Sequence, residues 1–305
     1  MKFIPALFIA VIVLSAYACT TKSLDVVNPT FSTPVTFSGQ TADALTISWV
    51  ATDGADGTKD DELSYKVVYS LTDNISTEAD VEANGTVLQD WTINSLTANM
   101  TTLDAVTIYY VTVLVRDSAG NTTISGGSAS TLCAGKIIFL ATVPNGNLSA
   151  PAGADTVCNS AKPTGFSAST FKAMVVDLTT RRACFSTGND NCGIIGTTGR
   201  LNWVLGASQP YCSSDYTIRV GTTNANSYLA VLAANTLSAT TVPVYTGLNA
   251  FWGTSSENCS GFLSTASTSQ LGTPNGTENG STAHSFITNG SGACTVAGKI
   301  YCVEQ

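Results

Sequence analysis

Charged side chains are scarce in this sequence. They make up 11% of its 305 residues, and 13 Lys and Arg stand against 21 Asp and Glu, which gives a formal net charge of -8. Proteins bind nucleic acids largely by neutralising phosphates with cationic side chains. This composition therefore argues against a nucleic-acid partner and, by the same reasoning, against sulfated glycans.

The residues that carry most enzyme chemistry are equally few. His284 is the single histidine, and it lies among Thr, Ser, Gly and Asn in a predicted loop, where we interpret it as an ordinary surface residue. The glycine pair Gly193 and Gly196 lacks the spacing of a phosphate-binding loop. No two cysteines have the C-x-x-C spacing of a zinc or redox site. We therefore expect no enzymatic activity, no cofactor and no metal ion.

Cysteine is absent from residues 20–132. Eight cysteines follow between Cys133 and Cys302, and a ninth, Cys19, precedes the gap. A chain of this length is long for one hydrophobic core and suits two, so we predict two domains that differ in disulfide content. Eight cysteines allow many pairings, and spacing alone does not choose among them.

The first residues have the composition of an export signal. Met1 and Lys2 form a short charged region, residues 3–16 are apolar, and the small residues Ala16 and Ala18 precede Cys19. This pattern predicts a signal peptide over residues 1–18. A membrane-spanning anchor is the alternative, but it needs about 20 apolar residues, and this stretch is shorter and contains Pro5.

Cys19 directly follows the predicted cleavage site. The segment resembles a bacterial lipobox, whose cysteine is acylated and becomes the new N-terminus. Ala16 stands where Leu is usual, with Leu14 further back, as in the looser lipoboxes of spirochaetes. We predict that Cys19 is lipidated, that residues 19–28 form a tether, and that the protein is anchored by lipid at the surface of the outer membrane. Plain cleavage that leaves Cys19 unmodified is the alternative.

Residues from Pro29 onward read as short strands separated by turns. Apolar and polar residues alternate in Leu45–Trp49, and Tyr109, Val111, Val113 and Val115 point to one face, which we predict to be core. Trp49 closes an early strand, and Leu103, Thr107 and Tyr109 look like a tyrosine corner. Residues 29–131 thereby resemble a fibronectin type III domain, and the resemblance implies an all-β sandwich that serves as a spacer.

Two polar segments of this region are predicted to have structural roles. The acidic run Asp53, Asp56, Asp60, Asp61 and Glu62 does not follow the spacing of an EF-hand loop, so we interpret it as a solvated turn. Ser125–Ser130 is small and rich in Gly and Ser, which predicts a flexible linker before the second domain.

Several strings of the second domain, residues 132–305, occur together in one known group. They are Ala154–Asn159, Phe171–Asp177, Arg181–Cys184, Tyr245–Asn249 and Tyr301–Gln305. Over residues 136–305 the chain resembles the DUF1554 domain of Leptospira lipoproteins, which is the endostatin-like module of the Len surface proteins.

The resemblance implies an α+β fold of the C-type lectin-like, endostatin-like type. In that plan a helix near Asp155–Lys162 carries Cys158, and a final strand over Lys299–Val303 brings Cys302 beside it. A second bridge would join Cys259 to Cys294. Cys184 and Cys192 would then be local partners, and Cys133 would pair with Cys212.

The same resemblance implies a surface adhesin that binds extracellular-matrix or complement-regulator proteins of a host, such as laminin, fibronectin, plasminogen or factor H. An outer-membrane structural lipoprotein without a host ligand is one alternative. A lectin is the other, although Thr273-Pro274-Asn275 lacks the acidic residue of the calcium-binding turn of C-type lectins.

Protein interfaces draw much of their energy from a few aromatic and arginine anchors. The second domain offers such residues, and most of them are expected in its core. Trp252 is adjacent to a polar stretch, so we predict it as the main ligand-binding residue, with Phe262 and Arg219 as further contacts.

Overall fold

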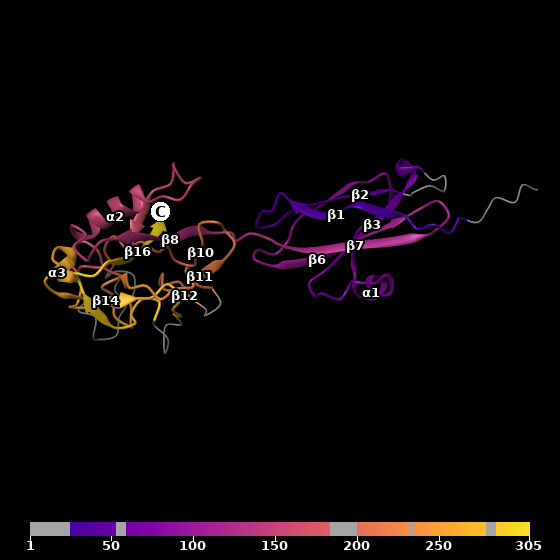
Figure 1. Ribbon diagram of the computed structural model, residues 1–305. Helices are drawn as coiled ribbons and strands as arrows, with labels where there is room; N and C mark the ends of the chain where they lie inside the picture. Colours follow the sequence, from indigo (N-terminus) through magenta and orange to yellow (C-terminus); the bar gives the residue numbers. More distant parts are fainter. Residues whose placement is uncertain (1–24, 53–58, 184–199, 232–234, 279–284) are drawn as a thin grey trace, which may run out of the picture.

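The computed structural model describes residues 25–52, 59–183, 200–231, 235–278 and 285–305. Its strands fall into two groups, β1–β7 and β8–β16, which a single stretch of chain connects (Figure 1). Among the described residues, no strand of one group pairs with a strand of the other. Strand pairing thus divides the described chain between β7 and β8, and we call the two parts the first and the second module.

The first module is a β-sandwich of two antiparallel sheets. One sheet has the strand order β1-β2-β5 and the other β4-β3-β6-β7. A 3-10 turn, η1 (Asp60–Glu62), precedes β3, and the helix α1 (Glu78–Asn84) connects β3 to β4. The strands are β1 (Thr30–Ser38), β2 (Leu45–Thr52), β3 (Ser64–Ser70), β4 (Thr86–Ile93), β5 (Thr97–Met100), β6 (Ile108–Arg116) and β7 (Thr122–Ser130).

The core of the first module lies between the two sheets. Trp49 of β2 and Tyr65 of β3 are fully buried there, with ring centroids 5.8 Å apart. The β6 face that begins with Tyr109 packs into the same cluster, as its alternation predicted. The Tyr109 hydroxyl accepts a hydrogen bond from the backbone N–H of Asp104 at 2.9 Å, which is the contact expected of a tyrosine corner.

The opposite face of β6 is buried as well, which its alternation did not predict. Leu114 packs with Val68 and with Val81 of α1, and the Thr112 hydroxyl donates to the carbonyl of Ile75 at 2.6 Å. The segment before α1 and α1 itself therefore cover this sheet. Thr77 holds α1 in place because its hydroxyl accepts from the Asp80 N–H at 3.1 Å, an N-cap.

Ser125–Ser130 is a strand and not the predicted linker. The segment forms the second half of β7 and pairs residue by residue with β6, from Val113 to Ile108. Its glycines suit packing, since a Cβ on Gly127 would lie 3.0 Å from the ring of Phe37. The Gly- and Ser-rich composition predicted a linker, but β6 supplies the backbone hydrogen bonds that make this segment a strand. The connection between the modules is instead the segment 131–135.

The second module is built on one mixed sheet with the main order β12-β11-β10-β8-β16-β13-β14-β15. Its strands are β8 (Lys136–Val143), β9 (Phe171–Ala173), β10 (Pro210–Cys212), β11 (Arg219–Thr223), β12 (Leu229–Val231), β13 (Val244–Tyr245), β14 (Thr268–Gly272), β15 (Ser291–Ala293) and β16 (Gly298–Glu304). Two helices accompany the sheet in the described chain, α2 (Ala150–Ser160) and the short α3 (Cys259–Phe262).

The strand β16 is central to this sheet. It pairs along its length with β8 and on its other side with β9 and β13. The helix α2 begins earlier than the expected residue 155, because Pro151 in its first turn is compatible with helix initiation. Cys158 of this helix is bonded to Cys302 of β16, so α2 is fixed covalently to the middle of the sheet.

Three disulfides are present in the described chain, and each joins the cysteines that the sequence analysis paired. Besides Cys158 with Cys302, Cys259 is bonded to Cys294 and Cys133 to Cys212. The expected partners Cys184 and Cys192 lie outside the described residues, as do Cys19 and His284. No helix in the described part of the chain is long and apolar enough to cross a bilayer.

Candidate functional site

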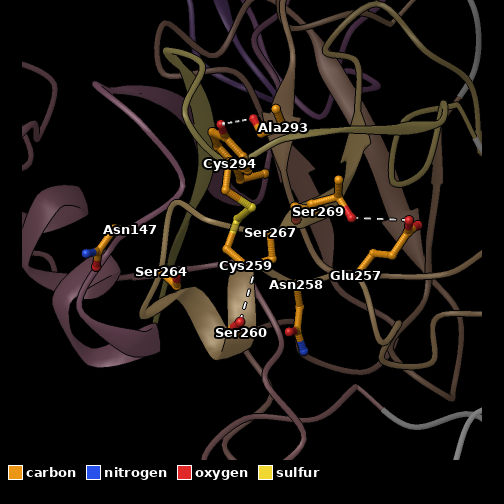
Figure 2. The surroundings of a disulfide bond; sticks show 12 residues. Asn147, Glu257, Asn258, Cys259, Ser260, Ser264, Ser267, Ser269, Ala293 and Cys294 are labelled. Carbon is orange, nitrogen blue, oxygen red and sulfur yellow. Dashed lines mark hydrogen bonds between the residues drawn. A yellow bond between two sulfur atoms is a disulfide. The ribbon is translucent and has the colours of Figure 1, made fainter.

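Three loops of the second module meet around the disulfide between Cys259 and Cys294 (Figure 2). They are residues 145–149, residues 257–268, which include α3, and residues 291–297, which include β15, and we call these three segments the tip loops. In Figure 1, α3 lies at the end of the module remote from β10, the strand beside the entry of the chain. The tip loops therefore occupy the far end of the second module.

Backbone hydrogen bonds join the tip loops to one another. The Gly146 N–H donates to the carbonyl of Cys294 at 2.8 Å, and the Leu148 N–H donates to the carbonyl of Phe262 at 3.0 Å. Gly146 has no substitute here, because a Cβ at this position would lie 2.3 Å from the Cys259 sulfur. The loops thus form one connected unit.

The turn α3 is left-handed. Cys259, Ser260, Gly261 and Phe262 have φ angles between +54° and +73°. This conformation costs a non-glycine residue roughly 1–2 kcal/mol, so the surrounding structure must hold it. The Asn258 side-chain oxygen accepts from the Gly261 N–H at 2.9 Å, and the disulfide and the buried Phe262 ring fix the two ends. Strain of this kind concentrates at binding and switch regions.

The tip loops display apolar side chains beside hydroxyls. Leu263 is 62% exposed and Val296 is 49% exposed. Ser260 is exposed, and its hydroxyl lies 3.3 Å from that of Ser267. Figure 2 marks this contact with a dashed line. This combination of exposed apolar and hydroxyl groups can contact a protein surface directly.

A fixed carboxylate lies next to this surface. The carboxylate of Glu257 accepts hydrogen bonds from the hydroxyls of Thr268 at 3.3 Å and Ser291 at 3.0 Å, and from the Gln270 amide. The Thr288 hydroxyl in turn donates to the Gln270 side-chain oxygen at 2.6 Å. Glu257 is therefore held in one orientation. Within the described ranges, no group of three His, Cys, Asp or Glu side chains could hold a metal ion.

The prediction that Trp252 is an exposed anchor is wrong. Its side chain is 2% exposed and packs against Trp203 and Tyr228, with ring centroids 6.1 and 5.5 Å away. The chain turns back at this point, because the Asn249 side chain accepts from the Gly253 N–H at 2.9 Å. Polar neighbours in the sequence did not reveal that this turn carries the ring inward.

Phe262 is also a core residue and not a ligand contact. It is completely buried, in a different hydrophobic cluster from Trp252. Arg219 begins β11 opposite Cys212 and is partly buried. Its Nε is buried and has no hydrogen-bond partner among the described residues. The three predicted residues therefore do not form one binding surface.

Arg200 is the basic residue that the structure brings to the Trp252 cluster. Its Nη1 donates to the Ser227 hydroxyl at 2.8 Å, and its guanidinium lies 5.9 Å from the Tyr228 ring. Burial lowers the pKa of Arg200. The sequence pattern gives no reason to join Arg200 to these rings, because Ser227 and Tyr228 lie more than 25 residues further along the chain.

The tip loops carry only a faint signal in the sequence. Asn258 and Gly261 are residues that tolerate or stabilise turns, but nothing in the pattern indicates a left-handed turn across four residues. The proximity of Glu257 to Ser291 depends on the pairing of β14 with β15, which local pattern does not predict.

Comparison with known proteins adds a family match for the second module. A family model described as "Protein of unknown function (DUF1554)" matches residues 141–280. This agrees with the resemblance drawn from the sequence over most of that module. No curated protein is significantly similar to the chain.

Solved structures with similarity to the chain include fibronectin type III domains. The sixth such domain of human fibronectin type III domain containing protein 3 is 16% identical, with 32% of this chain and 81% of that chain covered and a TM-score of 0.26. The domain from human KIAA0970 protein is 14% identical, with 36% and 76% covered and a TM-score of 0.26. The sensor domain of the anti-sigma factor RsgI4 in Pseudobacteroides cellulosolvens is 17% identical, with 33% and 96% covered and a TM-score of 0.22.

Proposed function

We propose that this protein is an exported, lipid-anchored surface protein that binds host proteins of the extracellular matrix or regulators of complement. Laminin, fibronectin, plasminogen and factor H are the candidate ligands that the family resemblance implies. The observation that carries the proposal is the set of tip loops: a covalently braced surface with exposed apolar groups at the far end of a disulfide-bonded module.

The disulfides support an extracellular location. Such bonds persist in oxidising compartments and are rare in the cytosol. Two of the three disulfides of the described chain lie within the second module, and the third joins Cys133 of the connecting segment to Cys212 of that module. The first 18 residues have the pattern of a signal peptide. The first module is then a spacer between the membrane and the second module.

We also propose a C-type lectin-like, endostatin-like fold for the second module. The pairing of β8 with β16 supports it, because the two ends of the module lie side by side. The bridge from Cys259 to Cys294 lies, in sequence, within the span of the bridge from Cys158 to Cys302. This nested arrangement is the one that the resemblance implied.

The rigidity of the tip loops favours binding. A surface that is already ordered loses less conformational entropy when a partner docks. Leu263 and Val296 can bury apolar area, and the Glu257 carboxylate can accept hydrogen bonds or pair with a cation at the edge. These groups suit recognition of a protein surface by contact.

Binding to immobilised ligands tests the proposal. The purified protein is applied to laminin, fibronectin, plasminogen and factor H, and to a glycan array. Leu263→Asp should weaken the affinity for a bound ligand by about tenfold or more, equivalent to about 1.4 kcal/mol. Leu71→Asp is the matched control, because Leu71 is 60% exposed in the first module, and it should bind normally.

Three results would contradict the proposal. Background signal on every surface would favour a structural lipoprotein without a host ligand. Binding to glycans alone would favour a lectin. Equal loss of affinity in Leu263→Asp and Leu71→Asp would mean that binding does not depend specifically on the tip loops.

Lipid anchoring has its own test. Stable anchoring requires more than one acyl chain on the protein, and in this proposal Cys19 carries those chains. Cys19→Ser should therefore release the protein from the membrane into the aqueous phase of a detergent partition. The intact mass of the membrane-extracted protein should match acylation at Cys19. A mass equal to that of the cleaved, unmodified chain would rule out the anchor.

A further inference from the structure

A pocket of about 350 Å³ opens at the side of β8. Ile138, Phe139 and Leu140 of β8 form one wall. The remaining lining residues come from three other segments and are Pro163, Ser213, Ser214, Asp215, Ile218, Thr236 and Leu237. The lining thus combines apolar residues with hydroxyls and one carboxylate.

The pocket lies where β8 loses a neighbouring strand. On this side β8 is paired with β10, in parallel, only at Lys136 and Ile137. The strand β10 ends at Cys212, and the chain then turns through a loop in which the Ser213 N–H donates to the carbonyl of Ile218 at 2.9 Å. From residue 138 onward, no strand in the described chain replaces β10.

The backbone of β8 presents unused hydrogen-bonding groups in this gap. Backbone groups of alternate residues in a strand point to opposite sides. The Ile137 N–H points to the β16 side, where it donates to the side-chain carboxylate of Glu304 at 3.0 Å. The N–H of Lys299, which lies opposite Thr142, donates away from β8 to the carbonyl of Pro243 at 2.9 Å. Leu140 and Thr142 therefore direct their N–H and C=O groups away from β16.

Those groups are available to a ligand. Among the described residues, neither Leu140 nor Thr142 has a backbone hydrogen bond on the side away from β16. Unpaired edges of this kind are templates for an added strand. The regular spacing of donors and acceptors along β8 selects an extended peptide over a compact ligand.

The charge in the lining selects the side chain of that peptide. Asp215 is the one ionisable residue of the pocket, and it is exposed. The hydroxyl of Ser213 donates to its carboxylate at 2.5 Å and keeps the pKa of Asp215 below its ordinary value. The carboxylate is therefore ionised at neutral pH and favours a cation.

We propose that the free edge of β8 binds an extended peptide as an added strand, with an apolar side chain in the pocket and a basic side chain beside Asp215. Peptide recognition by strand addition obtains its affinity from backbone hydrogen bonds and its specificity from pockets for alternate side chains. This site is separate from the tip loops and does not depend on them.

A synthetic peptide tests the site. The probe is the acetylated and amidated peptide Ser-Val-Lys-Val-Lys-Val-Ser, titrated into the purified protein. A peptide with Pro for the central Val should bind about tenfold more weakly, as expected when one or two backbone hydrogen bonds are lost. A peptide with Glu in place of both Lys should also bind more weakly. Equal binding of all three peptides would overturn the proposal.

Variants of the protein locate the peptide. Asp215→Asn should weaken binding of the Lys peptide by about two- to fivefold, the range of an exposed ion pair. Asp73→Asn is the matched control, since Asp73 is an exposed carboxylate of the first module, and it should bind normally. Leu263→Asp, in the tip loops, should also leave peptide affinity unchanged. Loss of peptide binding in either of these two variants would count against the site.

Amide hydrogen exchange gives an independent measurement. The Leu140 amide should exchange rapidly in the free protein and become at least about fivefold slower with saturating Lys peptide, because the added strand accepts its hydrogen. Protection of Leu140 before any peptide is added would mean that another part of this chain fills the gap. That result would overturn the proposal, as would peptide-dependent protection confined to the tip loops.

Discussion

The guanidinium of Arg181 donates hydrogen bonds to both carboxylate oxygens of Asp155, with nitrogen–oxygen distances of 2.9 and 2.7 Å. The two side chains are 5% and 21% exposed. Asp155 belongs to α2, and the Arg181 Nη1 also donates to the carbonyl of Ala173 in β9 at 2.7 Å. The ion pair therefore connects the helix to the sheet on the side of β9.

Removal of one partner of this pair should destabilise the second module. Asp155→Ala leaves the Arg181 cation buried without its counter-ion, and we expect a loss of about 3 kcal/mol or more in the free energy of unfolding. The double variant Asp155→Leu with Arg181→Met should recover much of that loss, because it removes both charges. Calorimetric unfolding of the whole protein measures both.

An ion pair with only one exposed partner, Glu82, provides the comparison. Lys66 and Glu82 are 2.9 Å apart in the first module, where Glu82 is 69% exposed. Glu82→Ala should change the stability by less than about 1 kcal/mol. A larger effect at Glu82 than at Asp155 would contradict the structural importance given to the buried pair.

Trp252→Ala should act through the core. The ring is buried between two other aromatic rings, so we expect a loss of about 3–5 kcal/mol in the free energy of unfolding. Leu263→Ala removes an exposed side chain and should cost little. Urea unfolding monitored by tryptophan fluorescence, with far-ultraviolet circular dichroism as a second probe, measures both. Near-wild-type stability of Trp252→Ala would contradict the burial of this side chain and favour a surface position.

The second module should lose stability in acid. Burial acts to raise the pKa of Asp177, but hydrogen bonds from Thr180, Arg181 and Thr179 outweigh burial and lower it below 3.8. The unfolded chain then takes up a proton at higher pH than the folded chain does. The stabilisation is present above pH 3.8 and disappears as the pH falls through the folded value.

Melting temperatures measured between pH 7 and pH 2 check this expectation. Asp177→Asn should show a smaller decrease with acidification than the natural protein. The same decrease in both proteins would assign acid sensitivity to other carboxylates.

Reduction should affect one module only. The bridge from Cys158 to Cys302 spans 144 residues, and its loss should cost about 5 kcal/mol in the chain-entropy model. The bridge from Cys259 to Cys294 spans 35 residues and should contribute about 4 kcal/mol. Calorimetry with reductant should lower the transition of the second module and leave that of the first, which contains no cysteine. A shift of both transitions would contradict the assignment of two independent cores.

Much of the fold could be predicted from local pattern. Alternation located the core face of β6, and the position of Tyr109 indicated the corner at Asp104. Local pattern does not predict the conformation of a segment that is determined by residues distant in the sequence. Ser125–Ser130 has the composition of a linker but finds hydrogen-bond partners in β6, which no property of the segment itself reveals.

The candidate site was harder to predict for a related reason. A tryptophan beside polar residues is buried or exposed according to the direction of the turn that carries it, and the positive φ of Trp252 directs the ring inward. The left-handed turn at Cys259 is maintained by contacts with Cys294 and Leu148. Those contacts are distant in the sequence, so local propensity gives no indication of them.

The position of β16 at the centre of its sheet has a consequence for how the second module is made. Synthesis delivers a chain from its N-terminal side, so β8, β9 and β13 are all present before the strand that joins them. Contacts between distant segments form slowly, and incomplete sheets expose apolar surface meanwhile. The partner of Cys158, Cys302, is made last, after both Cys133 and Cys212. A bond formed early between Cys158 and Cys133 or Cys212 would therefore have to be exchanged before Cys302 could pair with Cys158.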